Sequence, residues 1–199
     1  MPAARTESDS TDPENAINVE LMLRVKAGDH SAFEKLVELH QNAVIGTVAK
    51  MLGSNMDAED IAQQVFIRLW KSAAKYEVRA KFTTFLYTIT RNLVFNESRR
   101  RKNKKEQSLE EKEEVSFKQI EDLGSVNPEK ELLKAEMRNH VDEAIAQLPE
   151  KQRMAVVLRR YENMPYEEIA DVLELSVSAV KSQLFRARTS LRELLSQYL

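Results

Sequence analysis

Residues 166–188, YEEIADVLELSVSAVKSQLFRAR, contain the pattern that decides the fold of this chain. The first half has the apolar spacing of a short helix, whose inner side would be formed by Ile169, Ala170 and Leu173. Leu175 would fill the turn after this helix, and Ser176 is placed to cap a second one. Glu174 departs from the usual pattern, because glycine is common at that point of the turn. The stretch predicts a helix-turn-helix.

The second helix of this pair has an apolar stripe on one side and a polar, basic surface on the other. At about 100° per residue, the polar surface contains Ser178, Lys181, Ser182, Phe185 and Arg186. Phe185 is informative, because a phenylalanine on a polar surface loses burial unless a partner covers it. Thymine methyl groups or sugars in a DNA major groove would cover the ring, and packing on a neighbouring helix is the structural alternative. The basic surface favours DNA binding.

The rest of the chain also shows helical rather than alternating apolar spacing. Ser31, with Glu34 three residues later, matches a capping box, and Asn127-Pro128 matches a helix start. We therefore expect an all-α protein made of two small helical domains. The expected parts are a polar, disordered tail at 1–18, a first domain at 19–103, an acidic linker at 104–127 and a second domain at 128–199.

The composition excludes several kinds of site. The 199 residues include no cysteine, which excludes disulfides, thiolate catalysis and cysteine-based zinc sites, and the three histidines are too scattered to suggest a metal site. The N-terminus is acidic and lacks the apolar stretch of a signal peptide. The longest run without Lys, Arg, Asp or Glu, 39–49, is too short to cross a membrane. We expect a cytoplasmic protein with no cofactor, no metal and no enzymatic activity.

The formal net charge of −2 averages over blocks of opposite sign. Residues 79–105 carry nine basic residues and one acidic residue, and residues 176–195 carry four and one. Residues 1–20 and 106–136 are acidic, with net charges of −4 and −6. Two basic blocks in an otherwise neutral or acidic chain are typical of nucleic-acid binding, whereas a single block can equally be a solvated helix face.

Residues 57–75 predict an amphipathic helix that has a second distinctive surface outside its core side. This surface contains Asp60, Gln63, Gln64, Ile67 and Lys71, with Arg68 and Trp70 on its flanks. An apolar Ile67 and Trp70 among polar residues indicate a protein-binding surface. A thick core that buries both sides of the helix explains the pattern equally well.

The next helix begins near residue 82 and runs into a basic stretch at 99–102. Five residues lie outside the apolar stripe of this helix: Tyr87, Arg91, Asn92, Phe95 and Arg99. Exposed aromatic rings stack on bases and cations bind phosphates, so this pattern indicates binding of single-stranded nucleic acid. A solvated basic patch would explain the arginines but not an exposed Tyr87 and Phe95.

Four motifs in order carry a family resemblance: Asp57-Ala-Glu-Asp-Ile-Ala-Gln-Gln-Val-Phe, Phe82-Thr-Thr-Phe-Leu-Tyr-Thr-Ile-Thr-Arg-Asn, Leu148-Pro-Glu-Lys-Gln-Arg and Tyr166-Glu-Glu-Ile-Ala. Over about residues 20–195 the chain resembles bacterial RNA polymerase sigma factors of the extracytoplasmic-function (ECF) subfamily. The resemblance implies a sigma region 2-like first domain and a helix-turn-helix, region 4-like second domain. The partners it implies are core RNA polymerase, promoter DNA (duplex at −35, single-stranded at −10) and, as a further candidate, an anti-sigma factor.

The resemblance also implies roles for particular residues. Core polymerase would be bound by Asp60, Gln63, Gln64, Arg68 and Trp70. The −10 element would be opened and held by Tyr76, Phe82, Asn92 and Asn96, with Arg99, Arg100 and Arg101 on the backbone. The −35 element would be read by Arg159, Tyr166, Ser178, Lys181, Ser182, Phe185 and Arg186. The implied function is promoter-specific initiation of transcription, and the alternative is a helix-turn-helix regulator that acts without core polymerase.

Overall fold

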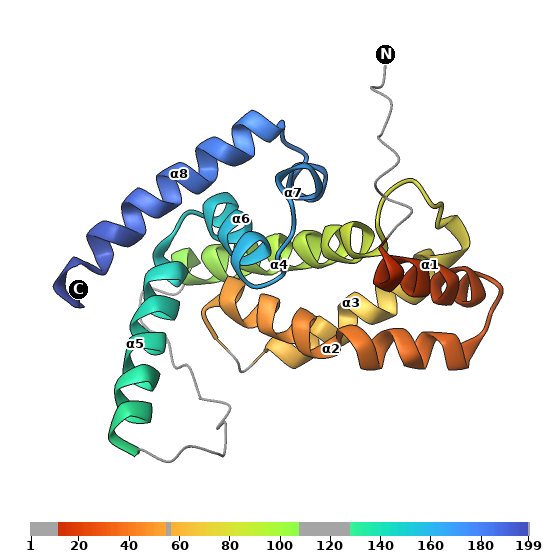
Figure 1. The fold of residues 1–199 in the computed structure, drawn as a ribbon, viewed down its shortest axis with the longest axis horizontal. Coiled ribbons are helices and arrows are strands. Elements are labelled where there is room, and N and C mark those ends of the chain that lie inside the picture. Colours follow the sequence, from red (N-terminus) through yellow and green to blue (C-terminus); the bar gives the residue numbers. More distant parts are fainter. Residues whose placement is uncertain (1–11, 55–56, 108–127, 199) are drawn as a thin grey trace.

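The computed structural model describes residues 12–54, 57–107 and 128–198, which form helices joined by short loops. The helices are α1 (Pro13–Lys26), α2 (His30–Leu52), α3 (Ala58–Ser72), α4 (Phe82–Gln107), α5 (Pro128–Gln147), α6 (Glu150–Arg160), α7 (Tyr166–Leu173) and α8 (Val177–Leu194), with short 3-10 helices at Ala73–Lys75 and Ser196–Tyr198 (Figure 1). The described ranges contain no strand, so the all-α prediction is confirmed.

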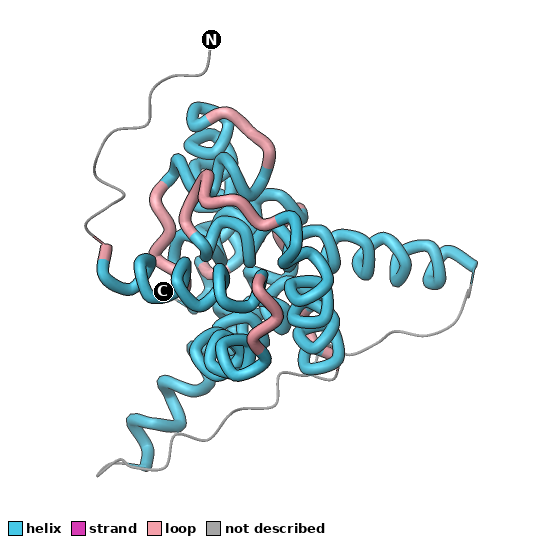
Figure 2. Tube along the Cα trace, turned by 90° about the vertical axis from the view of Figure 1, so that its right-hand side faces the viewer, coloured by secondary structure: helices cyan, strands magenta, loops and turns pink. Residues whose placement is uncertain are grey.

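The N-terminal unit consists of α1 to α4. Helix α2 packs against α1 and α3, and α3 packs against α4. The side chains between them are apolar and fully buried, among them Met22, Leu36, Val65, Leu69 and Leu86. The last turns of α4 project beyond the other helices (Figure 2), and Lys102, Asn103 and Lys104 are exposed there.

Two helix starts differ from the expected ones. Helix α1 begins at Pro13 rather than near Val19, because the Asp12 carboxylate accepts a hydrogen bond from the Asn15 N–H and Pro13 occupies the first helical turn. Residues 1–11 of the expected tail lie outside the described residues. The prediction that Ser31 caps the second helix was wrong. Helix α2 starts at His30, two residues earlier than a Ser31 cap would place it, and Asp29 caps it by accepting from the Ala32 N–H at 3.1 Å.

The Arg24 side chain explains why Asp29 takes this position. Its guanidinium donates from Nε and Nη2 to Asp29 Oδ2, at 2.9 and 2.7 Å, while Oδ1 remains available to cap the helix. One carboxylate therefore closes the turn between α1 and α2. At the other end of α2, Gly53 adopts the left-handed conformation, with φ of 66°, which ends the helix.

The C-terminal unit contains the predicted helix-turn-helix, formed by α7 and α8. Ile169, Ala170 and Leu173 are buried, and the Ser176 hydroxyl accepts from the Ala179 N–H at 3.2 Å. Both features confirm the prediction. Glu174 in the turn has φ of 54° and ψ of 47°, the left-handed region that the missing glycine would have adopted freely. For a residue with a Cβ this conformation costs roughly 1–2 kcal/mol.

The two units pack directly against each other and share one apolar core. Helix α7 contacts α4, and α6 contacts α2, so segments far apart in the sequence lie side by side (Figure 1). The Arg153 guanidinium of α6 donates to the Met51 carbonyl in the last turn of α2, where a cation also interacts favourably with the helix dipole. The sequence predicted two units and a linker but not this contact.

The linker expected at 104–127 is described only in part. Helix α4 continues to Gln107, and Pro128 begins α5 as predicted. Residues 108–127 lie outside the described residues. No helix in the described part of the chain is both long enough and apolar enough to cross a membrane.

Candidate nucleic-acid and protein interfaces

The outer surface of α8 presents the side chains that the helix-turn-helix pattern predicted. Phe185 is 68% exposed, so the alternative in which it packs on a neighbouring helix is wrong. Lys181, Ser182, Phe185 and Arg186 together line one shallow hollow on this surface. Ser178 lies one turn before them, and its carbonyl accepts from the Ser182 hydroxyl at 3.0 Å. An apolar ring between two cations and a hydroxyl has the chemistry to contact both bases and phosphates.

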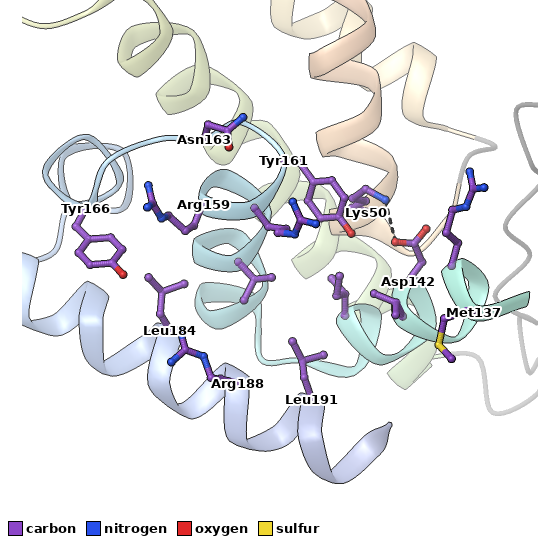
Figure 3. Close-up of a pocket in the computed structure, with 15 residues that line it drawn as sticks. Lys50, Met137, Asp142, Arg159, Tyr161, Asn163, Tyr166, Leu184, Arg188 and Leu191 are labelled. Atoms are coloured by element: carbon purple, nitrogen blue, oxygen red, sulfur yellow. Dashed lines mark hydrogen bonds and ion pairs between the residues drawn. The ribbon is translucent and has the colours of Figure 1, made fainter. Parts of the chain in front are cut away.

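Arg159 and Tyr166 lie in a different place from the other predicted −35 residues. They line a pocket of about 850 Å³ between α5, α6 and α8, beside Leu184 and Arg188 (Figure 3). The Arg159 guanidinium lies over the Tyr166 ring at 5.2 Å and donates to the Met164 carbonyl at 3.0 Å. The structure therefore groups five of the seven predicted residues on α8 and separates these two.

The pocket itself was not predicted from the sequence. Its apolar lining comes from three helices and includes Val141, Ile145, Val156, Leu184 and Leu191. Apolar spacing along a helix predicts which side of it is buried, but it does not show whether neighbouring helices cover that side completely. At the edge of the pocket, Lys50 of α2 pairs with Asp142 at 2.8 Å and lies over the Tyr161 ring at 4.3 Å (Figure 3).

The second surface of α3 is exposed, so a core that buries both sides of this helix is wrong. Asp60, Gln63, Gln64 and Arg68 are exposed, and Ile67 is 52% exposed among them. Trp70 is half-buried at the edge of this surface, where its ring stacks on His30 at 4.6 Å between centroids. The five residues predicted to bind polymerase thus lie on one helix and share its outer side.

The predicted −10 residues are divided between the core and the surface. Asn92, Asn96, Arg99 and Arg100 are exposed on α4, while Tyr76 and Phe82 are only 2% and 0% exposed. Phe82 is the first residue of the apolar stripe of α4, and its ring lies 5.2 Å from that of His40. The Tyr76 ring lies 5.2 Å from that of Phe85. In this arrangement Tyr76 and Phe82 do not reach the surface that the asparagines occupy.

The prediction that Tyr87 is exposed was wrong, and Phe95 is half-buried. Tyr87 is 3% exposed, and its hydroxyl donates to the Glu162 carboxylate of the other unit. Burial and this carboxylate raise the pKa of the Tyr87 phenol, which therefore remains protonated as a donor. Side-chain spacing along α4 placed Tyr87 outside the stripe, but it could not show that the second unit covers this side.

The basic stretch at the end of α4 is partly neutralised. Glu97 accepts from Arg100 at 2.8 and 2.9 Å and from Arg101 at 3.1 Å, and Arg101 also pairs with Asp57. The hydrogen bonds from Arg100 and Arg101 lower the pKa of the Glu97 carboxyl. The spacings of three and four residues were visible in the sequence as a signal for these pairs. Arg99 is exposed and is not part of this cluster.

The contact between the units buries Arg91, which the sequence had placed among the exposed residues outside the apolar stripe of α4, so that expectation was wrong. Arg91 is 7% exposed, and its Nη2 donates both to Asn92 Oδ1 at 2.6 Å and to Glu174 Oε1 at 2.7 Å. Lys81 pairs with Glu168 at 3.2 Å. The sequence showed Glu174 where glycine was expected, but nothing in the spacing of the chain indicated that it would pair with Arg91, 83 residues away.

The described residues include no group of three or more His, Cys, Asp or Glu side chains that could hold a metal ion. The chemistry of the described surfaces is instead that of binding: apolar and aromatic side chains next to cations on α8, and an apolar side chain among carboxylate, amide and guanidinium groups on α3.

The chain matches two family models in the order of its two units. Residues 36–104 match Sigma-70 region 2, and residues 138–191 match Sigma-70, region 4. The RNA polymerase sigma-H factor of Pseudomonas aeruginosa is 32% identical over 184 residues, which cover 90% of this chain and 94% of that protein. The ECF RNA polymerase sigma factor SigW of Bacillus subtilis is 33% identical over 177 residues, covering 85% and 92%.

Two solved structures share the fold. CnrH, in complex with the cytosolic domain of CnrY, gives a TM-score of 0.66 at 23% identity and covers 91% of this chain and 98% of its own. RpoE from Bartonella quintana, in complex with the anti-sigma factor NepR, gives 0.68 at 23% identity and covers 82% and 96%. With both regions matched in order and relatives above 30% identity over most of their length, the chain belongs to the sigma-70 family of RNA polymerase sigma factors, in its extracytoplasmic-function (ECF) group.

Proposed function

We propose that this protein binds core RNA polymerase in the cytoplasm and directs it to promoters, with α8 reading the −35 element and α4 holding the opened −10 strand. The observation that supports the proposal most strongly is the outer surface of α8. Phe185 is 68% exposed there, between Lys181 and Arg186, and no described segment covers it. A free-standing aromatic and cationic helix surface fits a major groove, in which thymine methyl groups and guanine acceptors lie side by side.

Helix α4 supplies the second DNA contact. Asn92, Asn96 and Arg99 are exposed along it, so amide groups are available to bases and a guanidinium to the phosphates. Unstacking a base costs a few kcal/mol, and the capture of opened bases by protein groups compensates this cost. Tyr76 and Phe82 were expected to take part by stacking, which returns about 1–3 kcal/mol per base. Because both are buried, their participation requires a rearrangement of α4 against α1 and α2.

The exposed surface of α3 is the proposed polymerase contact. Ile67 and the edge of Trp70 provide apolar area, and Gln63, Gln64 and Arg68 provide the surrounding polar groups. An apolar centre with a polar rim is the usual composition of a protein–protein interface. CnrH and RpoE of Bartonella quintana were each solved with a protein partner, CnrY and the anti-sigma factor NepR. We propose that this chain likewise has an anti-sigma partner.

A binding experiment separates this proposal from a regulator that acts without polymerase. The chain, mixed with bacterial core polymerase, is run on a sizing column beside a Gln64→Ala/Trp70→Ala variant and a Glu34→Ala/Lys35→Ala control on the exposed side of α2. We expect the wild type and the control to co-elute with polymerase and the α3 variant to be depleted from the complex. Wild-type protein that elutes alone, or binding that survives the α3 variant unchanged, contradicts the proposal.

A further inference from the structure

The pocket between α5, α6 and α8 has apolar walls that the helices cover only in part. Its volume is about 850 Å³, within the range of about 300–1,000 Å³ that is usual for small-molecule sites. Val141 of α5, Val156 of α6, and Leu184 and Leu191 of α8 line it, and all four remain only half-buried in the packed structure. A molecule with an apolar part would gain free energy by covering these side chains.

Positive charge gathers around the same pocket. Of the described residues that line it, one carries a carboxylate, Asp142, and five are cationic: Lys50, Arg138, Arg159, Arg160 and Arg188. Asp142 is already paired with Lys50 at 2.8 Å. The carboxylate of the pocket therefore leaves an excess of positive charge, and an anion is the ligand that this excess favours.

Three of these arginines keep their charge without an acidic partner. Arg159 donates from Nη1 to the Met164 carbonyl at 3.0 Å. That contact orients the guanidinium but does not neutralise it, because a carbonyl carries no net charge. Arg160 and Arg188 are exposed, and neither forms an ion pair with a carboxylate in the described part of the chain. Guanidinium groups bind carboxylate and phosphate oxygens through paired N–H donors, so these arginines are suited to an anionic head group.

The two ends of the pocket differ in charge. Arg159 and Arg188 lie toward one end, and the Lys50–Asp142 pair lies toward the other (Figure 3). Charged groups thus bound the apolar walls on both sides. A protein helix, about 10–12 Å wide with its side chains, needs an apolar strip that continues along its axis. The bounded walls favour a small molecule that has one charged end and one apolar chain.

We propose that this pocket binds a free, single-chain amphipathic anion, whose carboxylate or phosphate head group contacts Arg159, Arg160 and Arg188 and whose apolar chain covers Val156 and Leu184. The inference does not rest on the proposed function. Both halves of the ligand are needed, because an uncharged chain would cover the walls without pairing the guanidinium groups, and a small anion would leave the walls in water. Since the walls come from three helices, the bound molecule ties α8 to α5 and α6 and stabilises the folded state by mass action.

The test is calorimetric titration of the full chain with four probes at concentrations below those at which they form micelles. Dodecanoate and dodecyl phosphate carry both halves of the ligand, dodecylammonium reverses the charge, and acetate lacks the chain. Arg160→Gln/Arg188→Gln removes two cations from the pocket. The control, Lys151→Gln/Arg192→Gln, removes the same charge from exposed positions on α6 and α8 that are not among the residues lining the pocket.

A second variant tests the walls rather than the charge. Val156→Phe fills part of the pocket and keeps every cation, so it is expected to weaken binding of both anionic amphiphiles. Thermal unfolding of each protein, with and without dodecanoate, shows that the variants fold and whether the ligand stabilises them. We expect dodecanoate to raise the melting temperature of the wild type and of the control, and to raise it less in Val156→Phe and in the arginine variant.

We expect saturable binding of dodecanoate or dodecyl phosphate by the wild type, with one molecule per chain, and the stronger of the two identifies the head group. Binding is expected to be at least about tenfold weaker for acetate, for dodecylammonium and in the arginine variant, and nearly unchanged in the control. Absence of saturable binding, equal binding of dodecylammonium, or equal losses in variant and control overturns the proposal. Tighter binding of an amphipathic helical peptide of Leu and Glu also overturns it, because the occupant is then a protein segment.

Discussion

At the scale of single residues, the exposed side chains of α8 are the groups proposed to recognise the base sequence of the −35 element. Lys181→Ala or Arg186→Ala is expected to cost about 1–3 kcal/mol in binding to the preferred −35 sequence, provided that the side chain contacts a base edge. The measurement is polymerase-dependent binding to a matched pair of promoters that differ at one −35 base pair. Equal discrimination by wild type and variant would show that the side chain contacts only phosphate. Thr189→Ala, exposed one turn further along α8, is the matched control.

His40 gives a second residue-scale prediction, which concerns stability and pH. The ring is buried, and its Nε2 donates to the Asn18 side-chain oxygen at 2.9 Å. Burial lowers the pKa of His40 below its ordinary 6.5, and the Glu14 charge opposes this only in part. Between the unfolded and the folded pKa, the unfolded chain binds a proton that the folded chain does not. His40 therefore contributes stability above pH 6.5 that is lost as the pH falls through this interval.

The expected slope is at most about 1.4 kcal/mol of unfolding free energy per pH unit below 6.5. Urea unfolding of the wild type and of His40→Gln, compared at pH 8.0 and pH 5.5, measures it. We expect the wild type to lose more stability than the variant over this range. Parallel losses in the two proteins would show that His40 takes up its proton equally in both states.

At the scale of helices, the caps decide where the elements begin. The Ser176 hydroxyl accepts from the Ala179 N–H at the start of α8, which is the helix that carries Phe185. Ser176→Ala is expected to reduce the free energy of unfolding by about 1 kcal/mol. Ser190→Ala, within the same helix, is the control and should leave stability equal or slightly higher, since alanine is the better helix former. Chemical denaturation of the three proteins makes the comparison, and equal losses from both substitutions would rule out the cap.

The helices also show which structural features could be predicted from the sequence and which could not. The helix-turn-helix, the cap at Ser176 and the exposure of Phe185 followed from spacing within one segment, and local spacing is the information that a sequence displays most directly. Asp29 replaced Ser31 as a cap because Arg24, on the previous helix, orients its carboxylate. Tyr87 was misplaced for a similar reason, since the group that covers it, Glu162, is 75 residues away along the chain. Contacts of that range leave no periodic signal.

At the scale of the whole molecule, the opposite charges of the sequence become contacts between the two units. The net charge of −2 averages over basic groups on and just before α4 and acidic groups around α7, and the structure pairs some of them as Lys81–Glu168 and Arg91–Glu174. The packed arrangement leaves the outer surfaces of α3 and α8 exposed. The packing of the two units therefore covers neither of these two proposed interface surfaces.

The most direct test of the central claim is transcription from a promoter library by purified core polymerase. Start sites are sequenced with polymerase alone, with the wild-type protein and with Lys181→Ala/Phe185→Ala. The account predicts starts at a defined subset of promoters only when the wild type is present, with a shared −35 sequence among them that the variant no longer selects. Starts that are no more sequence-specific with the protein than without it would contradict the account.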